Sequence, residues 1–205
     1  MTVTAIEPRR KGLCALYIDG EEAMKLDAEI VLSHRILVGS EITDEQLHAC
    51  VIDSENKRCK DKAMWLISYR DHSRRELIEK LRHDYSSACA EAAVSRLEEL
   101  GLVDDERYAR RYAAELIEVR RLSDRGVRQK LREKGIDRDL IDEIMAQSEV
   151  DEQAQIREII EKKYARGLSD EKARRRAVNA LSRLGFAYSD IKSVLTEYIE
   201  TEEEY

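Results

Sequence analysis

The chain has 205 residues, of which 39% are charged and 42% apolar, with one proline, eight glycines and a formal net charge of −7. This composition is typical of long amphipathic helices around small cores, and the negative charge argues against a simple binder of polyanions. No apolar run approaches the roughly 18 residues of a membrane span, and the start, MTVTAIEPRRKG, has no signal-peptide pattern, so we expect a soluble cytoplasmic protein.

Residues 1–60 differ from the rest of the chain. Strand-like apolar runs on both sides of Asp19-Gly20 predict two or three short antiparallel strands, because this residue pair is typical of tight hairpin turns. A first helix is predicted over about 27–35. A second begins with the capping box Thr43-Asp44-Glu45-Gln46 and continues to about residue 52. Residues 53–60 are either a polar linker or an extension of that helix.

From residue 61 onward the chain has a helical pattern that repeats after fifty residues. The stretch KLREKGIDRDLI, residues 130–141, has the same pattern as ALSRLGFAYSDI, residues 180–191. Core and turn positions agree in residue type across this shift: Val127 and Ala177, Leu131 and Leu181, Gly135 and Gly185, Ile136 and Phe186, Ile141 and Ile191, Ile144 and Val194, Met145 and Leu195. A shift of fifty residues toward the N-terminus aligns Val127 with Leu77, Leu131 with Leu81 and Ser123 with Ser73.

The repeat predicts three units of three helices each. The predicted helices cover residues 61–70, 73–83, 87–100, 104–121, 123–134, 137–147, 151–166, 169–184 and 188–200. Glycines fall at helix ends, where a left-handed residue is favoured: Gly101, Gly135, Gly167 and Gly185.

The predicted fold is therefore mostly α, with three tandem helix-turn-helix-like repeats in an elongated, curved arrangement after a small N-terminal β-hairpin and helices. The expected domains are residues 1–60, then repeats at 61–103, 104–150 and 151–205, the last with an acidic tail.

Enzyme motifs are missing from the sequence: it has no phosphate-binding glycine loop, no dinucleotide fingerprint, no H-E-x-x-H and no G-x-S-x-G. We therefore predict no catalytic residue and no cofactor. The four cysteines form no C-x-x-C pair, and their spacing with His48 and His83 fits no zinc pattern, so reduced, mostly buried thiols are expected in place of a metal site.

Basic residues are concentrated in the second and third repeats. Between residues 107 and 138 there are eleven Lys or Arg and five Asp or Glu. Helical spacing places the candidate contact residues away from the predicted core: Arg107, Arg111, Arg121, Arg125, Lys130, Arg132, Lys134, Lys172, Arg175, Arg176 and Arg183. Two interpretations stay open: a solvated face with ion pairs one turn apart, or a contact surface for phosphates or an acidic protein groove.

Aromatic side chains are expected to belong to the cores. One stripe of the 104–121 helix comprises Ala109, Tyr112, Ala113, Leu116 and Val119. Tyr112 is predicted in the core and Tyr108 at its edge, although both could stack on bases. Trp65 is predicted to be a packing anchor.

Four stretches resemble the RecX family: SYRDHSRRELIEKL (68–81), LEELGLVDDERYARRYAAE (97–115), GVRQKLREKGID (126–137) and NALSRLGFAYSDIKSVL (179–195). The resemblance covers residues 60–200 well, and the entry to the second repeat, L-G-x-x-D-D-E-R-Y-A, is its most specific part.

The resemblance implies a modulator of RecA recombinase that lies in the groove of the RecA filament on single-stranded DNA. Such a protein limits the growth of the RecA filament or destabilises it. It thereby depresses the ATP hydrolysis, strand exchange and SOS co-protease activity of RecA. We expect a monomer with weak direct DNA binding. The alternatives are a direct DNA-binding protein built from tandem three-helix units, and a scaffold unrelated to nucleic acid.

Overall fold

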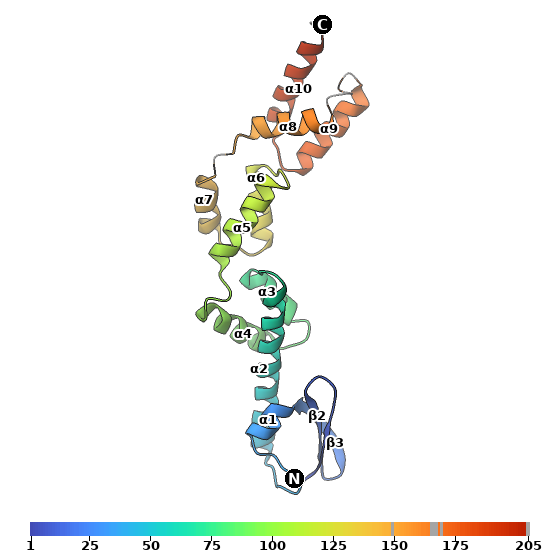
Figure 1. Ribbon diagram of the computed structural model, residues 1–205, viewed down its shortest axis with the longest axis vertical. Coiled ribbons are helices and arrows are strands. Elements are labelled where there is room, and N and C mark those ends of the chain that lie inside the picture. Colours follow the sequence, from blue (N-terminus) through green and yellow to red (C-terminus); the bar gives the residue numbers. More distant parts are fainter. Residues whose placement is uncertain (149, 165–167, 169, 204–205) are drawn as a thin grey trace. The chain divides into compact units, whose positions relative to one another are not determined.

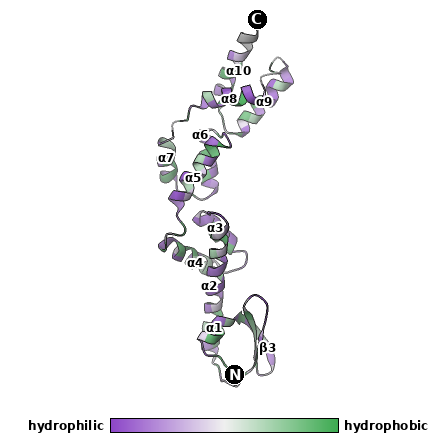
Figure 2. Ribbon diagram, viewed as in Figure 1, coloured by the Kyte–Doolittle hydropathy of each residue, from purple (hydrophilic) through white to green (hydrophobic). Residues whose placement is uncertain are grey.

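The computed structural model describes residues 1–148, 150–164, 168 and 170–203, the last five of them by their backbone alone. It divides into two compact units, Met1–Val103 and Asp104–Tyr205 (Figure 1). Hydrophilic and hydrophobic residues alternate along the helices of both units (Figure 2), as amphipathic segments require.

The N-terminal unit begins with an antiparallel sheet of order β1-β2-β3, formed by Val3–Pro8, Leu13–Ile18 and Glu21–Asp27. Asp19 and Gly20 connect β2 to β3 with φ angles of 49° and 93°, values that a tight hairpin turn needs. The predicted hairpin is confirmed, and the number of strands is three.

The short helix α1, Ala28–Ser33, follows the sheet directly. Its Val31 is buried with Val3 and Leu16 of the sheet and with Cys50 of the next helix. These residues form a small core of their own at the N-terminal end of the chain.

The long helix α2 runs without interruption from Asp44 to Tyr69. Thr43 and Gln46 form the predicted capping box at its start. Of the two alternatives for residues 53–60, a polar linker or an extension of the helix, the structure has the extension, and α2 also includes the helix predicted at 61–70. Ser54 and Cys59 are buried within this stretch, and no glycine or proline interrupts it, so the helix continues.

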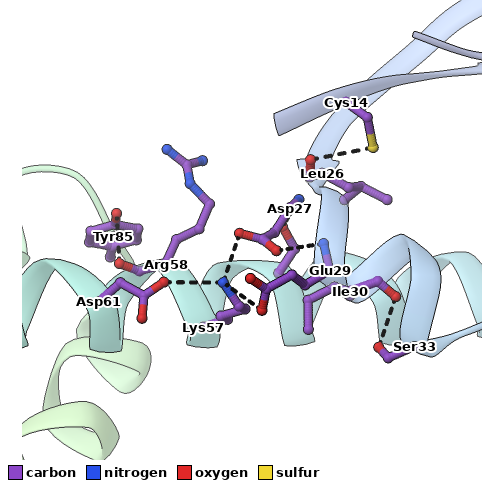
Figure 3. A network of polar contacts seen from close by, with 11 residues as sticks. Cys14, Leu26, Asp27, Glu29, Ile30, Ser33, Lys57, Arg58, Asp61 and Tyr85 are labelled. Carbon is purple, nitrogen blue, oxygen red and sulfur yellow. Dashed lines mark hydrogen bonds and ion pairs between the residues drawn. The ribbon is translucent and has the colours of Figure 1, made fainter. Parts of the chain in front are cut away.

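A charged network joins α2 to the sheet and α1 (Figure 3). The Lys57 Nζ lies 3.2 Å from Asp27 Oδ2, 3.4 Å from Glu29 Oε2 and 3.2 Å from Asp61 Oδ2. The Asp27 backbone N–H donates to Ser54 Oγ at 2.8 Å, and the Asp27 carboxylate also caps α1. The hydrogen bond to Asp27 raises the pKa of Lys57, so this cation stays charged beside a buried carboxylate.

The second half of α2 packs with α3, Arg74–Leu81, and α4, Ser87–Glu99, to form the first three-helix repeat. Cys59, Leu77, Leu81 and Leu97 belong to its core. One helix thus contributes to two cores, that of the sheet and that of the repeat.

The C-terminal unit contains the second and third repeats. Their helices are α5 (Asp105–Glu118), α6 (Asp124–Glu133), α7 (Arg138–Ala146), α8 (Glu152–Lys163), α9 (Glu171–Arg183) and α10 (Tyr188–Glu203). Gly101, Gly135 and Gly185 have the predicted left-handed φ angles at helix ends, of 68°, 78° and 97°. Gly167 lies outside the described residues.

The repeat predicted from the sequence is confirmed in its core. Every apolar residue of the seven pairs is buried, with no more than 7% of its surface exposed. The corresponding serines Ser73 and Ser123 are both fully buried, and each caps its helix by accepting the backbone N–H three residues on. The fifty-residue shift therefore describes structurally equivalent positions.

Three predictions about core residues are wrong. Val119 is 74% exposed, because α5 ends at Glu118 and the stripe does not reach it. Tyr108 is buried while Tyr112 is half-buried, since the two rings pack together with centroids 5.7 Å apart. Trp65 is 54% exposed, because it follows the buried Ala63 by two residues and so lies on the far side of α2.

Candidate functional site

The outer face of α9 carries a continuous set of exposed polar side chains, which we call the α9 basic face. Its residues follow helical spacing opposite the buried Ala177 and Leu181. They are Lys172, Arg175, Arg176, Asn179 and Arg183. The four cations were predicted from the sequence. Asn179 was missed, although its position one turn from Arg175 and from Arg183 could have identified it.

The cations of the α9 basic face have no carboxylate partner among the residues that the structure describes: no Asp or Glu oxygen there lies within 4.0 Å of Lys172, Arg175, Arg176 or Arg183. Asp170, two residues before Lys172, caps the helix by accepting the backbone N–H of Lys172 at 3.2 Å. Exposed cations at this density attract an anionic partner.

The second repeat carries a smaller version of this face on α6. Arg125 and Arg132 are exposed, and within the described parts of the chain neither has a carboxylate within 4.0 Å. Arg125 occupies the repeat position of Arg175. One turn further on, Gln129 corresponds to Asn179, so both arginines are followed by a neutral amide.

The first repeat differs at this position. Arg75 corresponds to Arg125 and Arg175, but its Nε lies 2.9 Å from Glu79 Oε1, one turn along α3. The glutamate replaces the amide of the other two repeats. Unneutralised arginines at this position are thus confined to the second and third repeats.

The other predicted contact residues have partners in the structure. Lys130 pairs with Glu133 at 2.7 Å, Arg121 with Glu158 at 3.1 Å, and Arg107 more loosely with Asp104 at 3.9 Å. Arg111 and Lys134 are likewise not free, and Lys134 Nζ lies 6.0 Å from the centre of the Tyr112 ring. These five residues therefore fit the interpretation of a solvated face with ion pairs better than that of a contact surface for an external partner.

A shallow groove in the second repeat is lined by Arg128, Arg132 and Arg138. Arg128 contacts Asp124 and Asp142, and its position is fixed by these two carboxylates. Burial opposes the charge of Arg128, but the hydrogen bonds to the two aspartates outweigh it and raise the pKa. The Arg132 Nε donates to the Arg128 carbonyl at 3.1 Å, which holds Arg132 at the edge of the groove.

Backbone contacts join the start of α6 to the end of α9. The Ser123 N–H donates to the Leu184 carbonyl at 3.1 Å. A Cβ on Gly126 would lie 2.4 Å from that same oxygen, and one on Gly185 would lie 2.5 Å from Ser123 Oγ. These two glycines permit a backbone approach that no other residue type allows.

Helix α8 supports the same junction with two glutamates. The Asp124 N–H donates to Glu152 Oε1 at 2.8 Å, and Arg121 pairs with Glu158. Lys162, and more weakly the charge of Arg121, lower the pKa of Glu158, so this carboxylate stays ionised. Through this junction the helices that carry the two sets of cations, α6 and α9, are joined end to end.

Within the described residues, no three His, Cys, Asp or Glu side chains are grouped as metal ligands. The four cysteines are free and buried, which confirms their predicted burial. The described helices include none that combines the length and apolar character of a membrane span.

Comparison with protein-family models gives three consecutive matches along the chain. The first three-helix domain of RecX matches residues 59–97, the second matches 104–145 and the third matches 150–195. Their order is the order of the three repeats.

Similar proteins cover nearly the whole chain. The regulatory protein RecX of Clostridium tetani is 27% identical over 97% of this chain and 94% of its own length. That of Clostridioides difficile is 26% identical over 98% of this chain and 97% of its own length.

Two solved structures share the fold. A crystal structure of regulatory protein RecX covers 94% of this chain and 98% of its own, with a TM-score of 0.63 and 22% identity. The RecX structure from Lactobacillus salivarius covers 70% of this chain and 96% of its own, with a TM-score of 0.57 and 21% identity. The three consecutive domain matches cover more than half of the residues, and the chain therefore belongs to the RecX family.

Proposed function

We propose that this chain is a cytoplasmic regulator that binds the RecA filament on single-stranded DNA and reduces its ATP hydrolysis, strand exchange and SOS co-protease activity. It acts by binding, as a monomer, and not by catalysis. Membership of a family whose relatives are named regulatory proteins supports this role.

The observation that carries the proposal is the α9 basic face together with Arg125 and Arg132. These exposed arginines and lysine have no neutralising carboxylate in the described residues, although the chain has an excess of acids. A filament offers two kinds of anionic partner, the phosphates of its DNA and acidic protein side chains. Exposed cations on the surface of helices suit either of them.

The direct test is a titration of RecA ATP turnover on single-stranded DNA with the purified chain. We expect turnover to fall at equal or substoichiometric amounts of the chain, while the chain alone hydrolyses no ATP. Binding should weaken as salt rises, because exposed charges are screened within about 8–10 Å at physiological ionic strength. Unchanged turnover at an excess of the chain would contradict the proposal.

The alternative is a direct DNA-binding protein that uses the same cations on phosphates. The resemblance of each repeat to a helix-turn-helix favours it, but the net charge of −7 opposes strong binding to naked DNA. The two functions differ in affinity for single-stranded DNA that is naked or coated with recombinase. A clear preference for the coated strand supports the filament regulator, and equal affinity supports the alternative.

A further inference from the structure

An exposed aromatic pair on α2 belongs to none of the hydrophobic cores that the described residues form. Trp65 is 54% exposed and Tyr69 is 80% exposed, and their ring centroids are 5.4 Å apart with the planes tilted by 54°. The core of the first repeat includes residues on either side of Trp65 in the sequence, but not Trp65 itself. Exposed aromatic rings that lie next to each other form a contiguous surface of the kind that marks interaction sites.

Two cations precede the rings on the same side of the helix. Arg58, Lys62, Trp65 and Tyr69 follow one another at spacings of four, three and four residues, which places them on one face of α2. Lys62 Nζ lies 5.1 Å from the centre of the Trp65 ring. At a rise of 1.5 Å per residue, the face extends about 16 Å along the helix.

The cations on this face are available to an anionic ligand. Figure 3 shows the Arg58 side chain directed away from the carboxylates around Lys57, and no carboxylate of the described chain lies within 4.0 Å of it. The Tyr85 hydroxyl donates to the Arg58 carbonyl at 3.2 Å, which holds the neighbouring loop against α2. The only carboxylate near Lys62 among the described residues is that of Asp84, at 4.0 Å, and exposed pairs of this kind contribute little.

We propose that Arg58, Lys62, Trp65 and Tyr69 form a binding site for single-stranded nucleic acid, in which bases stack on the aromatic rings and the two cations contact phosphates. Stacking rings beside a line of cations are the features by which proteins hold single strands without reading their sequence. A protein-docking face would be expected to place aliphatic side chains beside the rings, whereas the exposed Val51 of this face lies two turns before Arg58. The exposed Met64, next to Trp65 in the sequence, points to another side of the helix. The site is separate from the α9 basic face and does not depend on the proposed function.

Trp65 provides its own assay, because it is the only tryptophan in the chain. A short oligodeoxythymidylate, added to the full chain without recombinase, should quench Trp65 fluorescence as a base stacks on the ring. Trp65→Ala should weaken binding of this probe, measured by anisotropy of a labelled strand, by about tenfold. Trp65→Phe should retain most of the affinity, because it keeps a ring for stacking.

The controls separate stacking from general effects. Met64→Ala removes an exposed neighbour on another side of α2, and Tyr188→Ala removes an exposed ring from α10, so neither should change the affinity. Arg58→Ala should reduce the slope of log affinity against log salt by about 0.7, the loss of one single-strand phosphate contact.

Three results would overturn the site. The first is unchanged affinity of Trp65→Ala with circular dichroism equal to the parent. The second is equal binding of the parent to an abasic strand of the same length. The third is a change of Trp65 fluorescence with the recombinase filament but none with the naked strand, which would assign the aromatic pair to a protein partner. The first two results leave the proposed regulation of recombinase untouched.

Discussion

At the scale of single residues, one amide distinguishes the surroundings of Arg175 from those of its counterpart Arg75 in the first repeat. Glu79 neutralises Arg75 at 2.9 Å, whereas Asn179 leaves Arg175 without a carboxylate partner in the described chain. Asn179→Glu should recreate the ion pair of the first repeat on the third. An exposed pair of this kind changes stability little.

We therefore expect Asn179→Glu to fold as the parent does and to inhibit RecA ATP turnover less. Asn179→Gln, which keeps a neutral amide as Gln129 does in the second repeat, is the matched control and should inhibit normally. Equal inhibition by the Glu and Gln variants would mean that the charge at the centre of this face does not matter.

His72 should make the stability of the first repeat depend on pH. Its side chain is 3% exposed, and Nδ1 lies 3.5 Å from Glu76 Oε2. Burial, and then the positive charge of Arg70, lower its pKa, while Glu76 opposes them. In the unfolded chain a histidine titrates near pH 6.5, so the unfolded state takes up the proton first as the pH falls.

The contribution of neutral His72 is thus complete above about pH 6.5 and is lost as the pH falls toward the lower pKa of the folded state. Urea unfolding should show a decrease in stability between about pH 7 and pH 5 that His72→Gln reduces. His83→Gln, at an exposed position, should keep the slope of the parent. The same slope in both variants would exclude His72 as the cause.

At the scale of helices, the contact of α6 with the end of α9 requires a glycine. A Cβ at residue 126 would lie 2.4 Å from the Leu184 carbonyl oxygen. Alanine is the better helix former by about 1 kcal/mol, so propensity alone predicts that Gly126→Ala stabilises the chain. We expect the clash to prevail and the C-terminal unit to lose stability in urea.

Gly101→Ala is the matched control for this substitution. Its φ of 68° also disfavours alanine, but a Cβ there would meet no atom within 4 Å. It should therefore show only the backbone cost of about 1 kcal/mol. A Gly126→Ala variant as stable as the parent would show that the two helices separate readily.

The repeat register predicts equal roles for Leu131 in α6 and Leu181 in α9. Both side chains are fully buried, each in the core of its own repeat. Each leucine changed to alanine should reduce the free energy of unfolding by about 2–5 kcal/mol through lost burial and a residual cavity. Leu32→Ala, at a position that is 71% exposed, should cost far less. Equal costs at residues 32, 131 and 181 would contradict the register.

The helices and their repeat could be predicted because local signals agreed with one another. Serine caps, glycine ends and a shift of fifty residues all pointed to the same boundaries. The length of α2 could not be predicted, because residues 53–60 are polar and their burial depends on contacts with β3 and α4. Trp65 was assigned to a core by its residue type alone, whereas its place on α2 exposes it.

The candidate site was predictable only in part. Helical spacing identified the outward direction of Lys172, Arg175 and Arg176. It could not show that Arg121 reaches Glu158, since these residues lie 37 positions apart in the sequence. Partners on distant helices decide which cations are neutralised, and only the folded chain brings them together.

At the scale of the whole molecule, each of the three repeats has a small core of its own, and the exposed cations lie on the outside of the second and third. The predicted elongated, curved arrangement depends on how the two units are placed, and it stays a prediction. We propose that unneutralised cations on the C-terminal unit contact the RecA filament. Binding and not catalysis is then the property on which the function depends.

The most direct measurement is RecA ATP turnover on single-stranded DNA, titrated with the parent chain and with the double variant Arg175→Glu and Arg176→Glu. Both side chains are exposed on α9 and have no carboxylate partner in the described residues, so the variant should keep its helical content. We predict that the parent lowers turnover and that the double variant needs at least about tenfold more protein for the same effect. A double variant that folds normally and inhibits RecA as well as the parent would contradict the account.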